Sequence, residues 1–189
     1  MWWPEHRTSW LRLGKVACAL AAASLAGGCF QPLYGARPAT PGADTVHDKL
    51  AEVDIPPINA PRGSPTARVA VELRNELQFN LNNAAGANAP VYRLAVSVGS
   101  SQITVIVDPT SGRPSASVGG VVASYQLIEI ATGKVVVNDS TYAHVDYDAP
   151  GTQQRFASQR ALRDAEDRAT TVVADTIRNR LASYFVAGT

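Results

Sequence analysis

The chain has 189 residues, of which 46% are hydrophobic and 17% are charged, and its formal net charge is +1. This composition fits one globular domain and excludes a mainly disordered chain. Because nucleic-acid-binding proteins usually carry a concentrated basic surface, the near-neutral charge gives no reason to expect a nucleic-acid partner.

The first 28 residues have the pattern of an export signal. Arg7, Arg12 and Lys15 form a basic segment, and residues 16–28, which follow, carry no charge. The apolar stretch is shorter than the roughly 20 residues of a stable transmembrane helix. A basic segment followed by a short apolar one and by small residues is typical of a cleaved signal peptide. We therefore predict that residues 1–28 are removed.

Cys29 is the predicted lipid anchor. The other cysteine, Cys18, lies inside the apolar stretch, so Cys29 alone remains after cleavage. A single cysteine in an exported protein forms no internal disulfide, and acylation of its thiol explains its presence. Cleavage nearby that leaves Cys29 as a free thiol is the alternative. Phe30 follows the cysteine in place of Asp, which by resemblance to enterobacterial sorting rules favours the outer membrane.

Residues 29–50 are expected to form the acylated N-terminus and a proline-rich tether, because prolines remove backbone donors and stiffen the chain. The folded domain is predicted to span residues 51–186, with a short tail at 187–189. Residues 51–58 alternate apolar and acidic side chains before two prolines. This alternation predicts a short edge strand that enters the domain.

The first helix is predicted over about residues 66–83. Ser64 is suited to cap it and Pro65 to occupy its first position, where no backbone donor is needed. Apolar side chains recur every four residues: Val69, Leu73, Leu77 and Leu81.

A longer helix is predicted over residues 153–186. Its exposed face carries Arg and Asp, including an i to i+4 pair of Asp164 with Arg168, which indicates a solvated surface rather than a site. Its apolar stripe consists of Leu162, Ala165, Ala169, Val172, Val173, Ile177, Leu181 and Tyr184.

Three antiparallel strands are predicted between Pro90 and Tyr147, separated by turn signals at residues 108–114 and 131–134. The apolar positions of the first strand change parity after Val98, so a bulge at residues 99–101 is expected to return them to the same face.

The element order β-α-β-β-β-α predicts an α+β fold, in which an antiparallel sheet carries two helices packed on one face. The other face is left open to solvent or to a partner.

The sequence contains no Gly-rich phosphate loop, no metal-spaced cluster of Cys or His, and no Ser, His and Asp set in a recognisable context. His144 is expected on a strand as an ordinary surface or core residue. Asp139, Asp146 and Asp148 are carboxylates that strand ends and turns recruit in any case. We therefore predict a protein that is not an enzyme and has no metal site and no cofactor.

Residues 29–35, Cys-Phe-Gln-Pro-Leu-Tyr-Gly, together with the signal, tether and element order, resemble the alphaproteobacterial form of the LptE lipopolysaccharide-assembly lipoproteins. The resemblance covers nearly the whole chain, and the Phe-x-Pro-Leu-Tyr-Gly stretch is its most specific part. It implies a non-catalytic plug inside the outer-membrane barrel LptD, anchored in the outer membrane by its N-terminal lipid, that helps deliver lipopolysaccharide to the outer leaflet.

Contact with the anionic phosphates of lipopolysaccharide is expected from Arg113 and Arg155, which the topology places at one end of the sheet. Arg93 and Lys134 are expected to meet at the opposite end. The first pair is preferred because the lipid-contacting basic residues of the family resemble these turn positions. The alternative function is that of a structural envelope lipoprotein that binds periplasmic proteins or peptidoglycan.

Overall fold

The computed structural model describes the greater part of the folded region. All of the described residues belong to a single compact unit. The described residues are 45–82, 89–107, 109–110, 112, 114–148 and 154–187.

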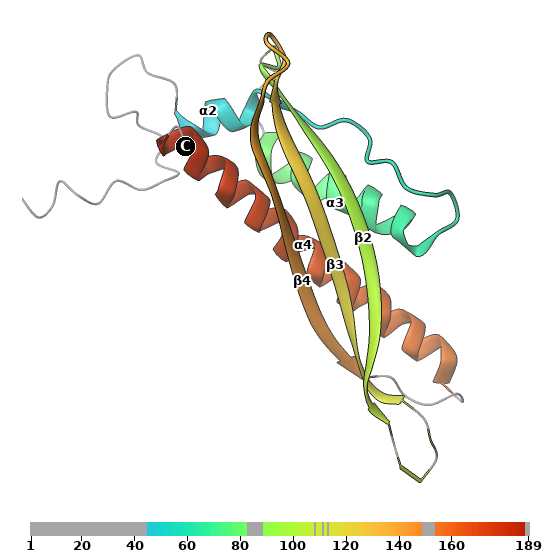
Figure 1. Cartoon of the computed structure of the whole chain (residues 1–189). Helices are drawn as coiled ribbons and strands as arrows, with labels where there is room; N and C mark the ends of the chain where they lie inside the picture. Colours follow the sequence, from blue (N-terminus) through green and yellow to red (C-terminus); the bar gives the residue numbers. More distant parts are fainter. Residues whose placement is uncertain are drawn as a thin grey trace, which may run out of the picture. The chain divides into compact units, whose positions relative to one another are not determined.

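The described residues form an α+β fold, as predicted. The elements in chain order are α2 (Val46–Ala51), β1 (Val53–Asp54), α3 (Pro65–Asn82), β2 (Tyr92–Val107), β3 (Pro114–Glu129), β4 (Val135–Asp148) and α4 (Arg155–Ala187). The strands form one sheet in the order β1-β2-β3-β4. The long strands β2, β3 and β4 pair antiparallel, whereas β1 pairs parallel with β2. Figure 1 shows α3 and α4 on the same side of this sheet, which confirms the predicted layering.

Helix α3 begins as the sequence predicts. The hydroxyl oxygen of Ser64 accepts a hydrogen bond of 3.2 Å from the backbone N–H of Ala67, which satisfies one of the donors that a helix start leaves unpaired. The predicted apolar stripe is confirmed, because Leu73 and Leu77 are fully buried and Val69 and Leu81 are 1% exposed. The stripe packs α3 against β2 and α4.

Helix α4 closes the core over β3 and β4. Most of its predicted stripe is confirmed, since Ala165, Ala169, Val173, Ile177 and Leu181 are all 0% exposed. One position is wrong: Val172 is 52% exposed. The buried stripe instead takes Val173 and Ala174 in this turn, both 0% exposed, and at 100° per residue Val172 then lies outside the stripe.

Strand β2 does not contain the bulge expected at residues 99–101. Its pairing with β3 continues without a shift from Tyr92 to Thr104, and the irregularities lie at Thr104–Ile106 and Ile106–Val107. The expected bulge is therefore wrong, and Ile103 stays on the face opposite the helices. A bulge disrupts the hydrogen-bond ladder locally. The Oγ atoms of Thr66, near the start of α3, and Ser100 on β2 lie 3.3 Å apart. Helix α3 therefore starts beside Ser100 and does not cover the later residues of β2, so a bulge would bring no apolar side chain there into a core.

Helix α2 is not foreseen by the sequence patterns, and all of it except Ala51 lies in the predicted tether, residues 29–50. Thr45 and Asp48 form a capping box at its start, and Leu50 is buried in the core at 2% exposure. Val53 of β1 and Ile55 are buried in the same core. The short strand predicted within residues 51–58 is present, although only Val53 and Asp54 pair with β2.

Among the helices that the structure describes, none is both long enough and apolar enough to cross a membrane.

Candidate functional site

The sheet face opposite the helices is exposed along most of its length. Residues directly opposite each other on antiparallel strands point to the same face, so the register defines cross-strand rows. We call the middle part of this surface the central open face. Its rows are Ala95–Gln126–Asn138, Ser97–Ser124–Ser140, Gly99–Val122–Tyr142 and Ser101–Gly120–His144. None of these residues is Asp, Glu, Lys or Arg, so the central open face consists of hydroxyls, amides, rings and small side chains.

Two glycines of the central open face, Gly99 and Gly120, leave room for neighbouring side chains above the strands. A Cβ atom at Gly120 would lie 2.6 Å from His144 Cδ2 and 2.6 Å from Ser101 Oγ, so the absence of a side chain is what lets both residues lean over this position. A Cβ at Gly99 would lie 3.2 Å from Val122 Cγ1. Glycine therefore creates the shallow floor over which the neighbouring side chains lie.

Tyr142 and His144 form a ring platform along β4. Their ring centroids are 5.3 Å apart and their planes are inclined by 46°, a spacing within the usual range for aromatic pairs. Tyr142 is 70% exposed, so most of its ring is accessible from solvent. The platform stands beside the floor at Gly120, because Tyr142 and His144 belong to adjacent rows.

A shallow groove of about 260 Å³ crosses β2, β3 and β4 at the polar end of the central open face. The amide nitrogen of Gln126 donates to the amide oxygen of Asn138 at 3.4 Å, and the hydroxyl of Ser97 donates to the backbone oxygen of Ser124 at 3.5 Å. Two primary amides have four donors and two acceptor oxygens between them, so one mutual hydrogen bond leaves most of this capacity available to a ligand.

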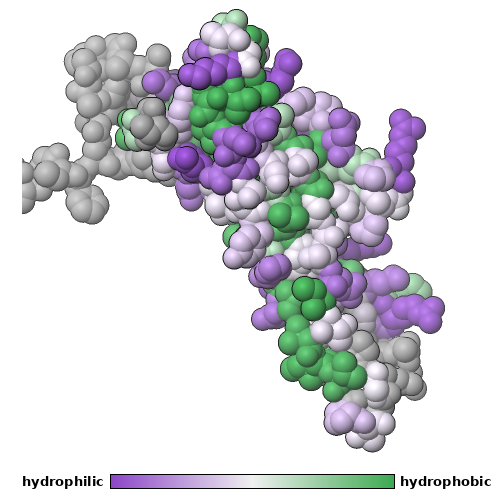
Figure 2. Space-filling view, in the orientation of Figure 1, coloured by the Kyte–Doolittle hydropathy of each residue, from purple (hydrophilic) through white to green (hydrophobic). Residues whose placement is uncertain are grey.

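The hairpin of β2 and β3 ends in an exposed apolar segment, which we call the apolar finger. Its members are Ile103 (56% exposed), Val105 (59%), Ile106 (55%) and Val107 (51%). Figure 2 shows apolar side chains gathered at the end of the sheet where this hairpin closes. An exposed apolar cluster of this kind usually marks an interaction surface.

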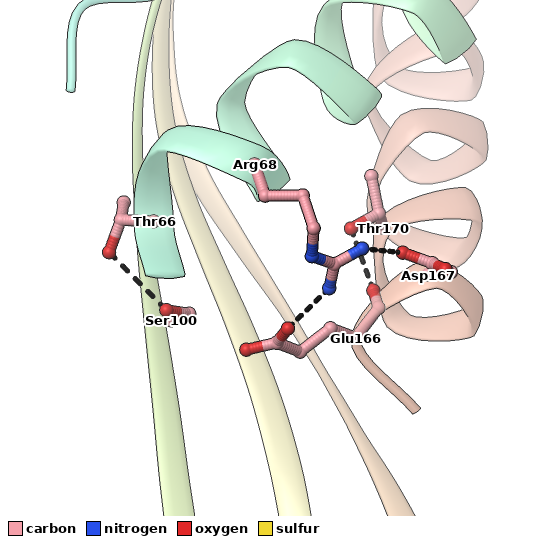
Figure 3. A network of polar contacts seen from close by, with 6 residues as sticks. All are labelled: Thr66, Arg68, Ser100, Glu166, Asp167 and Thr170. Atoms are coloured by element: carbon pink, nitrogen blue, oxygen red, sulfur yellow. Dashed lines mark hydrogen bonds and ion pairs between the residues drawn. The ribbon is translucent and has the colours of Figure 1, made fainter. Parts of the chain in front are cut away.

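A network of charged side chains joins α3 to α4 (Figure 3). Arg68 forms ion pairs with Glu166 and Asp167, and Thr170 donates a hydrogen bond of 2.7 Å to the backbone oxygen of Glu166. Partial burial opposes the charge of Arg68, but hydrogen bonds to Asp167 and Glu166 outweigh it and raise the pKa of the guanidinium. The network is internal to the helix pair, so its role is to fix α3 against α4.

The three strand carboxylates considered from the sequence do not form one group. Asp146 and Asp148 line an open pocket of about 400 Å³ between β4 and α4, together with Asp164 and Arg168. Arg168 Nε donates to Asp164 at 2.9 Å, which confirms the predicted i to i+4 pair. Asp139 instead accepts from Arg180 Nε at 3.4 Å. The described residues contain no group of His, Cys, Asp and Glu suited to hold a metal ion.

The family comparison decides how this fold is classified. The model of the LptE family, described as lipopolysaccharide-assembly, matches residues 50–181. The chain belongs to the LptE family. The match covers every described strand and most of the described helices, and it confirms the resemblance seen in the sequence.

Solved structures share the LptE-family fold with this chain. A Caulobacter crescentus protein described as a lipoprotein is 20% identical, with a TM-score of 0.58 over 75% of this chain and 96% of its own. Rare lipoprotein B from Shewanella oneidensis is 17% identical, with a TM-score of 0.50 over 71% and 96% of the two chains. Lipoprotein B from Nitrosomonas europaea is 12% identical, with a TM-score of 0.51 over 72% and 84%. A search of curated protein sequences found no match.

The residues predicted from the sequence to act in this LptE-family chain are only partly within the structure. Cys29 and Arg113 lie outside the described residues. Arg155 is the first residue of α4 and is exposed. At the other end of the sheet, Arg93 Nε pairs with Asp54 at 3.2 Å.

The sequence motifs considered above do not identify the central open face. Its signal was present in the sequence as the second parity of the last strand, where Asn138, Ser140, Tyr142 and His144 alternate with the core positions.

Proposed function

We propose that the chain is a non-catalytic lipoprotein of the outer membrane, which occupies the lumen of the LptD barrel and assists the delivery of lipopolysaccharide to the outer leaflet. The observation that carries this proposal is the LptE family match over residues 50–181. The polar central open face supports it, because the interior of large outer-membrane barrels is polar, unlike their lipid-facing surface.

The proposal is tested by affinity purification of the tagged full chain from outer membranes. A large β-barrel protein in strong excess over other partners, together with loss of surface lipopolysaccharide when the chain is depleted, is the expected result. Recovery of soluble periplasmic proteins or peptidoglycan alone, with surface lipopolysaccharide unchanged, would show that the chain is instead a structural envelope lipoprotein.

The anchor is proposed to be the acylated Cys29, exposed by removal of residues 1–28. One acyl chain gives only marginal membrane binding, so the anchor requires more than one chain, as bacterial lipoproteins carry. Mass spectrometry of the mature N-terminus is expected to find the acyl mass on Cys29. Cys29→Ser removes this mass and releases the chain from the membrane, whereas Cys18→Ser is the matched control and changes neither.

Arg113 and Arg155 are proposed to contact the phosphates of lipopolysaccharide. Two observations support their placement at one end of the domain: β3 begins at Pro114 beside the end of β4, since Ala116 pairs with Asp148, and α4 begins soon after at Arg155. The double variant Arg113→Ala with Arg155→Ala is expected to weaken binding of the purified chain to lipopolysaccharide.

The control for this double variant is Arg93→Ala with Lys134→Ala, which removes the same charge at the opposite end. If the first double variant binds lipopolysaccharide as well as the unchanged chain does, Arg113 and Arg155 are not the contact residues. If both double variants weaken binding equally, the loss of net positive charge explains the effect, whatever its position.

A further inference from the structure

The central open face has the chemistry of a binding surface for a neutral, hydroxyl-rich ligand. It contains no Asp, Glu, Lys or Arg side chain, so apart from His144 it offers no cation to a phosphate. Its exposed members are mainly hydroxyls and amides, with Ser97, Ser124, Gln126 and Asn138 around the groove. A surface of this kind does not suit an acyl chain either, because an apolar ligand would cover these donors and acceptors without replacing their hydrogen bonds to water.

Sugar rings combine the two properties that this surface matches. Their hydroxyls pair with Ser, Asn and Gln side chains, each of which both donates and accepts. Their C–H faces pack on the electron-rich face of an aromatic ring. On this domain the 70% exposed ring of Tyr142 stands next to the row Ser97–Ser124–Ser140, so one ligand reaches both kinds of contact.

The shape of the surface favours an extended saccharide over a single enclosed molecule. From Ala95 to Ser101 the rows extend about 20 Å at the usual rise of a strand. The groove of about 260 Å³ is shallow and smaller than the roughly 300–1,000 Å³ of enclosed ligand sites. Because His144 and Ser101 cover Gly120, the rings of His144 and Tyr142, rather than the strand backbone, form the accessible surface there.

We propose that the central open face binds the saccharide part of lipopolysaccharide, with Tyr142 as the stacking residue and with Ser97, Ser124, Gln126 and Asn138 as hydrogen-bonding residues. This inference rests on the proposed function, because that function supplies the glycolipid. The site is separate from Arg113 and Arg155, which are proposed to contact phosphates.

The direct test is an NMR titration of the ¹⁵N-labelled full chain, purified in detergent, with two separate probes. The first probe is a neutral oligosaccharide from the outer, phosphate-free part of the lipopolysaccharide saccharide, and the second is lipid A. The oligosaccharide is expected to shift the backbone amides of Ser97, Ser124 and Tyr142, and lipid A is expected to leave them in place. No shift on this face with the oligosaccharide, or equal shifts with lipid A, would overturn the proposal.

Variants of the ring platform test the stacking role. Tyr142→Ala is expected to weaken oligosaccharide binding about fivefold, whereas Tyr142→Phe keeps the ring and most of the affinity. Phe79→Ala is the matched control, since Phe79 is 64% exposed but lies on α3, away from the sheet face. Gly120→Ala, whose added Cβ meets His144 and Ser101 at 2.6 Å, is expected to lower the affinity without removing the Tyr142 ring. Equal affinities for Tyr142→Ala and the unchanged chain contradict the assignment.

The outcome separates this inference from the proposed function. If the barrel is recovered with the unchanged chain but the oligosaccharide does not bind, only the saccharide site fails. If Tyr142→Ala reduces recovery of the barrel and leaves oligosaccharide affinity unchanged, the central open face is a protein interface and the saccharide site is overturned. If the unchanged chain recovers no barrel, the proposed function fails, whatever the titration shows.

Discussion

Arg68 on α3 pairs with Glu166 on α4, and Glu166 is buried at 5% exposure although it is a carboxylate. Buried carboxylates persist when they are paired, and removal of one partner leaves the other with an unmet cost. We expect Arg68→Ala, which leaves the carboxylate of Glu166 buried without its partner, to lower the free energy of unfolding by about 1–3 kcal/mol, the usual cost of leaving a buried polar group unsatisfied. Urea denaturation followed by circular dichroism measures the change.

The control for this substitution is Asp167→Ala. Asp167 also pairs with Arg68, but its side chain is 49% exposed, and exposed ion pairs contribute at most about 1 kcal/mol. A loss for Asp167→Ala as large as that for Arg68→Ala would show that the buried Glu166 carboxylate is not what makes the loss of Arg68 costly.

Gly119 allows α4 to approach the sheet closely. A Cβ atom at this position would lie 3.2 Å from Ala165 Cβ on α4. Gly119→Val therefore overpacks the contact and is expected to cost about 1–3 kcal/mol of unfolding free energy. Ser124→Val introduces the same side chain on the same strand but on the exposed face, and it is expected to change stability by less than about 0.5 kcal/mol. Similar losses from both substitutions would contradict close packing at Gly119.

Burial raises the pKa of Tyr125 to about 12. The ordinary value is 10.0, so the folded chain holds this proton more tightly than the unfolded chain does. The resulting stabilisation is fully present below pH 10 and is lost as the pH rises through about 12. Spectrophotometric titration of the tyrosines is expected to show a late step that accompanies alkaline unfolding. Tyr125→Phe abolishes that step, whereas Tyr142→Phe retains it; a late step that survives Tyr125→Phe belongs to another residue.

The apolar finger is expected to bind apolar probes without contributing to stability. Ile103→Ser combined with Val105→Ser should reduce the fluorescence of a bound hydrophobic dye, because both side chains are more than half exposed. Each substitution should change the unfolding free energy by less than about 0.5 kcal/mol. Val71→Ser is the control, since Val71 is 61% exposed on α3 and outside the finger. Equal loss of dye binding in the control would show that scattered exposed residues, not the finger, bind the dye.

Both long helices were predictable from the sequence because their signals are local. A cap at Ser64 and a four-residue apolar repeat act within α3 itself, and the stripe of α4 has the same character. Helix α2 escaped prediction because its six residues are too few to show a helical period, and one buried side chain, Leu50, fixes it to the core.

The expected bulge in β2 failed for a reason that lies in tertiary structure. The parity change before Ile103 is real, but whether apolar residues turn inward depends on whether a helix covers that part of the strand. Helix α3 begins near Ser100, and no pattern within β2 reports where another element starts. The finger is therefore an outcome of where α3 begins.

The functional residues also divide into those inferred from local sequence and those that depend on tertiary structure. Cys29, Arg113 and the lipopolysaccharide contact of Arg155 stay predictions, because they rest on short motifs and on family resemblance. The central open face required the register, since only the pairing of β2, β3 and β4 brings Gly120 beneath His144 and places Tyr142 beside Val122.

The position of α4 after the four described strands has a consequence for the order of folding. Its contacts with α3 join residues 98 and 99 positions apart, and its buried face completes the core over β3 and β4. Contacts between such distant residues form after the entropy of a long loop has been lost. The β2–β3 and β3–β4 hairpins can pair before α4 is present, but the core over β3 and β4 closes only after the segment that forms α4 has been synthesised.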